Sequence, residues 1–149
     1  MRTVLKSNSE VAHYWANQVQ SHGHTKSFFF EGDSIYSYGK HFCVARILPS
    51  HVVAYSTRGY SSSTSRHKAL AASATRHRVG VFCIDPSESA AWNMRAARAD
   101  IASCLEPAKP YTRKSTLLSR RVKALHFTNQ ANAYLAALPL GEREDVAPL

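Results

Sequence analysis

The chain has 149 residues, of which 44% are apolar, and it carries a formal net charge of +9. This apolar fraction is sufficient for one domain with a hydrophobic core and argues against intrinsic disorder. The positive charge argues against an acidic mimic of nucleic acid and favours an anionic partner.

The first predicted element is a helix that begins near Ser9, a residue type that caps helices. Val11, Trp15 and Val19 recur at four-residue spacing, which is typical of the buried face of a helix. Gly23 fits the left-handed position that follows a last helical turn. We therefore expect Trp15 to anchor this helix in the core.

Runs of apolar and aromatic residues then predict strands at 28–30, 34–38, 41–48, 52–57 and 79–84. Gly32 and Asp33 fit a two-residue hairpin between the first two strands, with glycine at the first central position. Before the last strand, a Ser-rich segment predicts a helix that begins near Ser62 or Ser63 and runs through Ala74. This order predicts a strand-helix-strand crossover, which is right-handed if its two strands are parallel.

Two further helices are predicted in the C-terminal part. The first begins at the capping pattern of Asp85 and Pro86, ends near Pro107, and is expected to bury Met94, Ala97, Ile101 and Leu105. The second begins near Ser115, and the spacing of Leu118, Val122 and Leu125 predicts its apolar face. This helix either breaks near Asn129 or continues toward Leu138.

Together these elements predict an α+β fold with a small, mainly antiparallel sheet of about five strands, about four helices and one crossover. We expect a single globular domain over residues 1–141 and a frayed polar tail over residues 142–149. The start of the chain lacks the apolar core of a signal peptide, and no apolar run is long enough to span a membrane. We therefore expect a cytoplasmic protein with no membrane partner.

The cysteines and histidines do not form a metal-binding pattern. Cys43, Cys83 and Cys104 are widely spaced and include no C-x-x-C pair, so we expect free thiols in a reducing compartment, with Cys43 and Cys83 in strands and Cys104 in a helix. His22-x-His24 and His41-x-Cys43 could each supply two ligands, but no further ligand spacing accompanies them. We expect neither a metal nor a cofactor.

Basic residues are segregated from acidic ones along the chain. Segments 34–84 and 107–141 contain no aspartate or glutamate, yet they hold 13 of the 19 lysines and arginines. Such segregation is typical of a surface that contacts phosphate or another polyanion.

The main candidate site is the loop and helix start from Arg58 to Lys68, where free backbone N–H groups, hydroxyls and cations would meet. Tyr60 could stack on a base or bind a phosphate oxygen. The residues assigned to this anion- or nucleic-acid-binding site are Arg58, Tyr60, Ser61, Ser62, Ser63, Thr64, Arg66, His67, Lys68, Arg76 and Arg78. The alternative is an ordinary helix cap beside a solvated basic face.

Two other surfaces are candidates. A secondary basic patch consists of Arg113, Lys114, Arg120, Arg121 and Lys123. The second is a group of aromatic residues beside Lys40 and His41, namely Tyr36, Tyr38 and Phe42. These rings could stack on unpaired bases, but the pattern favours the alternative that they pack in the core.

The residues of the first helix and strands carry a resemblance to a known family. The motifs are VAHxWA from Val11, FxFxGxxIYSYGxHFxVA from Phe28 and TRxYSxxTxxH from Thr57. Together they resemble a family of small, largely uncharacterised proteins of bacteriophages and other mobile elements, over residues 8–85. The chain departs from that pattern at Cys43, where proline is expected in many relatives. The resemblance implies an origin in a mobile element and a location in the bacterial host cytoplasm, and it assigns no catalytic residue.

Three functions are compatible with these patterns. The favoured one is a non-catalytic phage-type accessory protein that binds nucleic acid or another polyanion. The alternative is an interaction protein of the anti-CRISPR type, which inhibits a host defence complex by contacting a host protein or ribonucleoprotein. The third is a small metal-independent nuclease or nucleotide-binding enzyme with His13, His41 or His67 as the base. No catalytic residue is assigned, because the carboxylates are scattered along the sequence. The sequence indicates neither an oligomeric state nor a preference for DNA or RNA.

Overall fold

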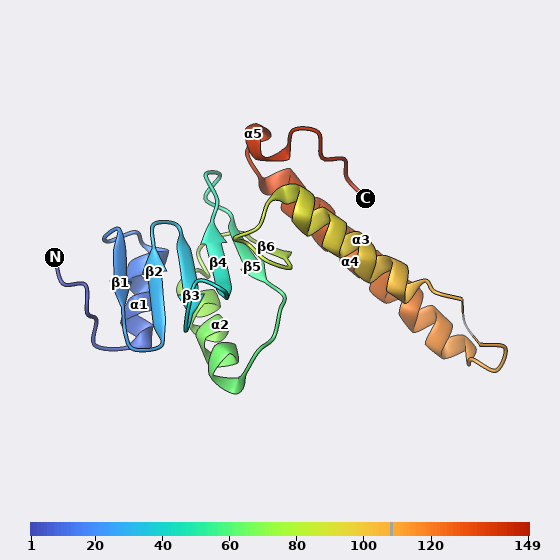
Figure 1. The fold of residues 1–149 in the computed structure, drawn as a ribbon, viewed down its shortest axis with the longest axis horizontal. Helices are drawn as coiled ribbons and strands as arrows, with labels where there is room; N and C mark the ends of the chain where they lie inside the picture. Colours follow the sequence, from blue (N-terminus) through green and yellow to red (C-terminus); the bar gives the residue numbers. More distant parts are fainter. Residues whose placement is uncertain (108) are drawn as a thin grey trace.

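The computed structural model describes residues 1–107 and 109–149 as one mixed sheet accompanied by helices (Figure 1). The strands are β1 (His22–His24), β2 (Phe28–Glu31), β3 (Ser34–Ser37), β4 (Cys43–Ile47), β5 (Val53–Ser56) and β6 (Gly80–Cys83). The helices are α1 (Asn8–Ala16), α2 (Ser62–Ala74), α3 (Ala90–Cys104), α4 (Lys114–Ala137) and α5 (Leu140–Arg143). The predicted α+β fold is confirmed.

The strands lie in the sheet in the same order as in the sequence. The first five pair antiparallel, and β6 pairs parallel with β5 after the chain crosses over through α2. The mainly antiparallel sheet and its single strand-helix-strand crossover are therefore as predicted. The predicted hairpin is also confirmed, since Glu31 pairs with Ser34 and Gly32 has a φ of +57°, which glycine adopts without strain.

The sequence did not predict β1. Gly23, which we expected to end the first helix, is instead the buried centre of this strand. A Cβ at Gly23 would lie 2.9 Å from a methyl carbon of Leu5, so the absence of a side chain permits close packing. The left-handed residue after α1 is Gln18, with a φ of +49°.

Helix α1 is shorter than expected. Its N-cap is Ser7 rather than Ser9, and the Ser7 hydroxyl accepts a hydrogen bond from the Glu10 amide. Because the helix ends at Ala16, Val19 lies outside it and is 56% exposed. Trp15 is fully buried, and its Nε1 donates to the Asp33 carbonyl oxygen at 2.8 Å, so this anchor is confirmed.

Two hydrophobic clusters lie on opposite faces of the sheet. Helices α1 and α2 cover one face, and the sheet-proximal ends of α3 and α4 cover the other face at β5 and β6 (Figure 1). The change of face is visible within β5, where Val53 belongs to the first cluster and Ala54 to the second.

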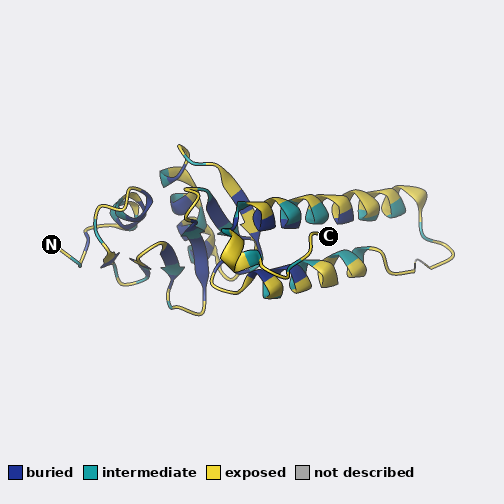
Figure 2. Cartoon of the chain, turned by 90° about the horizontal axis from the view of Figure 1, so that it is seen from above, coloured by how far each residue is buried: buried dark blue, intermediate teal, exposed yellow. Residues whose placement is uncertain are grey.

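Helices α3 and α4 pack along each other as a hairpin that projects from the β6 edge (Figures 1 and 2). Helix α3 begins later than predicted, with Ser89 as its N-cap, because Asp85 instead accepts hydrogen bonds from the backbone N–H and hydroxyl of Ser87 in the preceding turn. Met94 is buried as expected, whereas Leu105 is exposed. Helix α4 continues through Asn129 without a break.

The C-terminal residues contact the rest of the chain, contrary to the expectation of a frayed tail over residues 142–149. Asn132 exchanges two hydrogen bonds with the backbone of Leu149, and Val146 packs against the second cluster. Glu142 forms a two-point ion pair with Arg46 of β4. These contacts attach the tail to both α4 and the sheet.

Candidate cationic hairpin and the predicted loop site

The side chain of Arg58, the first residue of the predicted loop site, makes several contacts within the protein. Its Nη2 lies 3.0 Å from an Asp85 carboxylate oxygen and donates to the His41 carbonyl oxygen at 3.4 Å. Its guanidinium carbon lies 4.9 Å from the centre of the Phe42 ring. Asp85 lies just beyond the acid-free segment in sequence, so the fold supplies the carboxylate that the local sequence lacks.

Helix α2 starts where the sequence predicts. Ser61 is its N-cap, and the Ser61 hydroxyl accepts from the Thr64 amide at 3.1 Å. This cap satisfies a backbone donor that an anion would otherwise contact. Thr64 is buried, and Lys68 donates from Nζ to the Arg58 carbonyl oxygen at 2.7 Å, while burial lowers the pKa of Lys68. The cation of Lys68 therefore serves the loop backbone.

His67 is a buried structural residue and not a surface contact. Its ring stacks on Phe28 with 4.5 Å between centroids, and its Nδ1 lies 2.7 Å from the Ser37 hydroxyl. Burial lowers the pKa of His67 and favours the neutral imidazole. Within residues 1–107 and 109–149, no carboxylate hydrogen-bonds to this ring, so a Ser-His-carboxylate triad is not formed.

The other assigned loop residues divide between exposed and internally bonded side chains. Tyr60, Arg66 and Arg76 are exposed, as is Ser62, whereas Ser63 is half-buried. Arg78 donates from Nη2 to the Ala16 carbonyl oxygen at 2.9 Å, at the end of α1. The loop thus keeps few cations for a partner. The assignment of Arg58, Thr64, His67, Lys68 and Arg78 to a polyanion surface is corrected, because their side chains are buried or bonded within the protein.

The aromatic candidates on the strands give a similar result. Tyr36 stacks on Phe29 of β2 with 5.1 Å between ring centroids, and Phe42 is buried. Tyr38 lies just after β3 and is exposed. The nearby cation of Lys40 is paired with Glu31 at 2.8 Å. The three rings therefore do not form one surface beside Lys40, because Phe42 belongs to the core cluster under α1 and α2 and Tyr36 stacks on Phe29 outside that cluster.

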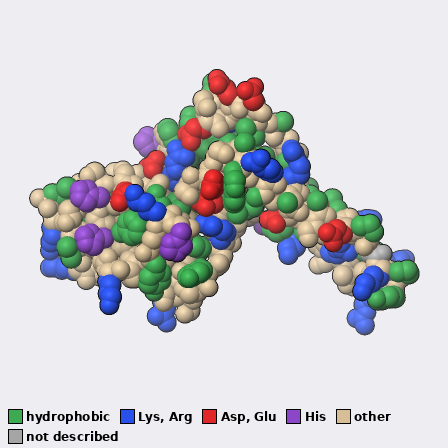
Figure 3. All heavy atoms as spheres, in the orientation of Figure 1, with side chains coloured by type: hydrophobic (Ala, Val, Ile, Leu, Met, Phe, Trp, Pro, Cys, Tyr) green, Lys and Arg blue, Asp and Glu red, His purple; other side chains and the backbone are tan. Residues whose placement is uncertain are grey.

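The helical hairpin carries the largest group of unpaired cations. In the part of the chain that the structure describes, none of these side chains lies within ion-pairing distance of a carboxylate: Arg95, Arg98, Lys109, Arg113, Lys114, Arg121 and Lys123. All seven are exposed, and Lys and Arg side chains gather toward the far end of the hairpin in Figure 3. We call α3, α4 and their connecting residues the cationic hairpin.

The predicted secondary patch lies on this hairpin, but one of its residues, Arg120, makes contacts within the protein. Arg120 donates to the backbone carbonyl oxygens of Cys104 and Glu106 at 3.0 and 2.8 Å, so it joins α4 to the end of α3. Arg95 and Arg98 of α3 were missed, because Asp100 follows them closely in sequence and the segment is not acid-free. Their separation from carboxylates is evident only in three dimensions.

An apolar stripe lies on the same helix. Leu118, Val122 and Leu125, which we expected to form the buried face of α4, are 63, 60 and 61% exposed. The buried face instead carries Ala124, Ala131, Tyr134 and Leu135. Figure 2 shows exposed residues along the outer sides of the hairpin. The helical period was predicted correctly, but the face that packs was not.

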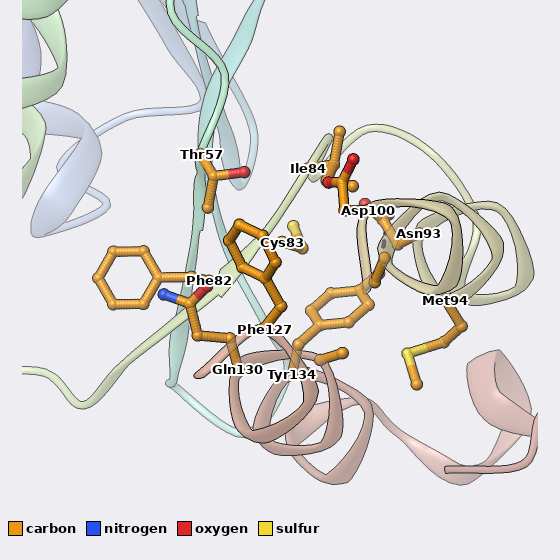
Figure 4. A pocket seen from close by; sticks show the side chains of 12 residues that line it. Thr57, Phe82, Cys83, Ile84, Asn93, Met94, Asp100, Phe127, Gln130 and Tyr134 are labelled. Atoms are coloured by element: carbon orange, nitrogen blue, oxygen red, sulfur yellow. Dashed lines mark hydrogen bonds between the residues drawn. The ribbon is translucent and has the colours of Figure 1, made fainter. Parts of the chain in front are cut away.

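A small cleft of about 40 Å³ lies between β6 and the base of the hairpin (Figure 4). Phe82, Met94 and Phe127 contribute apolar walls. The polar groups at its base are bonded to one another, since Asn93 donates to the Tyr134 hydroxyl oxygen at 3.2 Å, and burial raises the pKa of Tyr134. The cleft thus has mainly apolar walls, and Thr57, Asp100 and Gln130 also line it.

Metal-dependent chemistry finds no support in the described residues. No group of three or more His, Cys, Asp or Glu side chains among them could hold a metal ion. The structure therefore adds no catalytic assignment to the sequence analysis.

None of the helices in residues 1–107 and 109–149 has the length and apolar character that a membrane span requires.

Comparison with known proteins finds no matching family, curated protein or solved structure. The resemblance to phage proteins consequently rests on the motifs of the first helix and strands alone.

Proposed function

We propose that this protein binds nucleic acid through the cationic hairpin, as a non-catalytic accessory protein of a bacteriophage or related mobile element in the bacterial cytoplasm. The carrying observation is the set of seven exposed hairpin cations that no described carboxylate neutralises. Such cations release counterions when they contact phosphates, and this release supplies most of the affinity of non-specific binding.

The geometry favours the hairpin over the loop from Arg58 to Lys68. Of the five cations assigned to the loop site, Arg66 and Arg76 lie in solvent, whereas the fold uses the other three internally: Arg58, Lys68 and Arg78. The hairpin also projects from the sheet (Figure 1), so its exposed cations lie along an extended element that can follow a phosphate backbone. Base readout is not part of this proposal, because backbone contacts carry no direct sequence information.

The test is an anisotropy titration of a duplex and of a single-stranded oligonucleotide, repeated across salt concentrations. Arg113→Ala/Arg121→Ala/Lys123→Ala should weaken binding and lower the salt slope by about one per lost phosphate contact. The matched control is Lys26→Ala/Arg66→Ala/Arg76→Ala, which removes the same charges from exposed positions elsewhere. Equal losses in the two variants would indicate diffuse electrostatics, and binding that does not depend on salt would contradict the proposal.

A second candidate function has an observation of its own. The exposed stripe of Leu118, Val122 and Leu125 favours a protein partner, because contiguous exposed apolar surface commonly marks an interaction site. An inhibitor of a host defence complex, of the anti-CRISPR type, would use such a surface against a host protein or ribonucleoprotein.

A further inference from the structure

The outward face of α4 combines an apolar seam with cations on its border. The seam consists of the exposed residues Leu118, Val122, Leu125 and Asn129, which are separated in sequence by four, three and four positions. This spacing is that of a coiled-coil seam, with leucine at d positions and Val122 and Asn129 at a positions. A single asparagine at an a position is a known determinant of register.

The seam has no partner in the described chain. The buried residues Ala124 and Ala131, of which Ala131 belongs to the second cluster, lie on a different side of α4 from the seam. Three neighbouring side chains that are each about 60% exposed leave apolar surface in water along consecutive turns of the helix. Burial of that surface would stabilise a complex, whereas contact with phosphates would not bury it.

The charge of α4 identifies the chemistry of the occupant. Helix α4 contains Lys114, Arg120, Arg121 and Lys123 and no acidic residue. Lys114 and Arg121 precede a positions of the heptad, so they occupy the g positions that border the seam. Neither is within ion-pairing distance of a carboxylate in residues 1–107 and 109–149.

We propose that the outward face of α4 binds an acidic amphipathic helix of a partner protein, whose leucines fill the seam and whose carboxylates face Lys114 and Arg121. Pairing of opposite charges at the border of a coiled coil sets the choice of partner. A second copy of this chain is a poorer occupant, because it would bring the same cations and no carboxylate to the interface. An acidic helix would also compete with nucleic acid for Arg121, so it would regulate the hairpin if the proposed function is correct.

The probe is a synthetic three-heptad peptide of about 21 residues with leucine at d, valine or asparagine at a, and glutamate at e and g. One control peptide has the same composition in scrambled order, and another has lysine in place of glutamate. The full-length protein should bind the acidic heptad peptide about tenfold or more tightly than either control. Equal binding of the scrambled peptide would overturn the proposal, because charge alone would then suffice.

Two sets of variants locate the site. Leu118→Gln/Val122→Gln/Leu125→Gln should abolish peptide binding and leave nucleic-acid binding unchanged. The control Val19→Gln/Val79→Gln/Leu140→Gln, at exposed apolar positions outside the seam, should change neither. If the seam variant does not fold, Lys114→Glu/Arg121→Glu keeps the test decisive, since it should reverse the preference toward the lysine peptide. Unchanged peptide preference in that variant would overturn the proposal.

Other occupants give distinct results. A wild-type dimer in sedimentation that the seam variant converts to monomer would assign the face to a second copy and overturn the proposal. Binding of phosphatidylglycerol vesicles without binding of the acidic peptide would assign it to a membrane surface. Peptide binding without any nucleic-acid binding would support this inference and remove the proposed function, so the two fail separately.

Discussion

Arg58 Nη2 lies 3.0 Å from Asp85 Oδ2, and this ion pair connects the loop after β5 to the turn after β6. The other carboxylate oxygen of Asp85 accepts from the Ser87 amide at 2.9 Å and from the Ser87 hydroxyl. Asp85 is buried, and the Arg58 guanidinium also covers the Phe42 ring. The pair therefore links the segment between β5 and α2 to the turn that precedes α3, the first helix of the hairpin.

Arg58→Ala should consequently lower the stability of the fold. Removal of the guanidinium leaves a buried carboxylate without its cation, which costs about 1–3 kcal/mol of the free energy of unfolding. Urea denaturation measures this loss. Arg66→Ala, which removes an exposed cation, should leave the unfolding midpoint unchanged.

A double-mutant cycle separates the ion pair from the packing of Arg58 on Phe42. The combined Arg58→Ala/Asp85→Ala variant should lose less stability than the two single variants added together, because each single change leaves one charge unpaired. Strict additivity would show that the pair contributes nothing to folding.

Trp15→Ala should be among the most destabilising single changes in the chain. The side chain is fully buried between α1 and the sheet, and truncation of a buried aromatic costs about 3–5 kcal/mol. Chemical denaturation monitored by circular dichroism gives the value. Trp15→Phe keeps most of the volume but loses the hydrogen bond to the Asp33 carbonyl oxygen, so it should fall between the wild type and the alanine variant.

Local sequence signals predicted much of this fold because the residues that decide these features are neighbours. Gly32 sets the hairpin by its own backbone conformation, and Ser61 caps α2 through the Thr64 amide three residues later. The order of strand, helix and strand likewise defined the crossover from β5 to β6.

Features that depend on distant residues were not predictable in this way. Helical spacing identified Leu118 as part of an apolar face, but the partner α3 packs on another side of α4. Arg58 lies in an acid-free segment, yet Asp85 reaches it through the fold. His67 looked like a surface residue of a basic helix, and Phe28 and Ser37 from two strands bury it. For this reason, the cations that remain free to contact a partner are found mainly on the hairpin and not on the loop that the sequence favoured.

Protein stability should fall in acid because of His67. The Thr25 hydroxyl donates to the side-chain Oδ1 of Asn8, which turns the Asn8 Nδ2 toward His67 Nε2 at 3.3 Å. Nε2 is then the acceptor and Nδ1–H donates to the Ser37 hydroxyl at 2.7 Å. A second ring proton, on Nε2, would face the Asn8 amide donor and would have the Ser27 hydroxyl at 3.4 Å as its acceptor.

The sign of the pH effect follows from the lowered pKa of His67, which burial causes. The unfolded chain, with a histidine pKa near the ordinary value of about 6.5, takes up the proton before the folded chain does. The free energy of unfolding should thus decrease as the pH falls below about 6.5, and above that pH it should not vary with the titration of His67. Urea denaturation at several pH values measures the slope.

His67→Gln supplies the comparison for this slope. The variant should be less stable than the wild type near neutral pH, because it loses the stack on Phe28, and its stability should depend less on pH between about 6.5 and 5. Parallel pH profiles for the two proteins would assign the acid effect to other groups.

The three cysteines should differ in their reaction with a maleimide. Burial raises the pKa of Cys43 to about 12 and raises the pKa of Cys83 as well, so neither presents a thiolate at neutral pH, and both thiols are shielded from solvent. Cys104 is only half-buried at the end of α3. Mass spectrometry should therefore find rapid single labelling of the native chain and labelling of all three thiols in urea.

Cys104→Ser should abolish the rapid reaction, whereas rapid labelling of Cys43 would contradict the packing of β4 in the sheet. Because Cys104 lies on the cationic hairpin, a fluorophore at this position should also respond when an oligonucleotide or an acidic helix binds there.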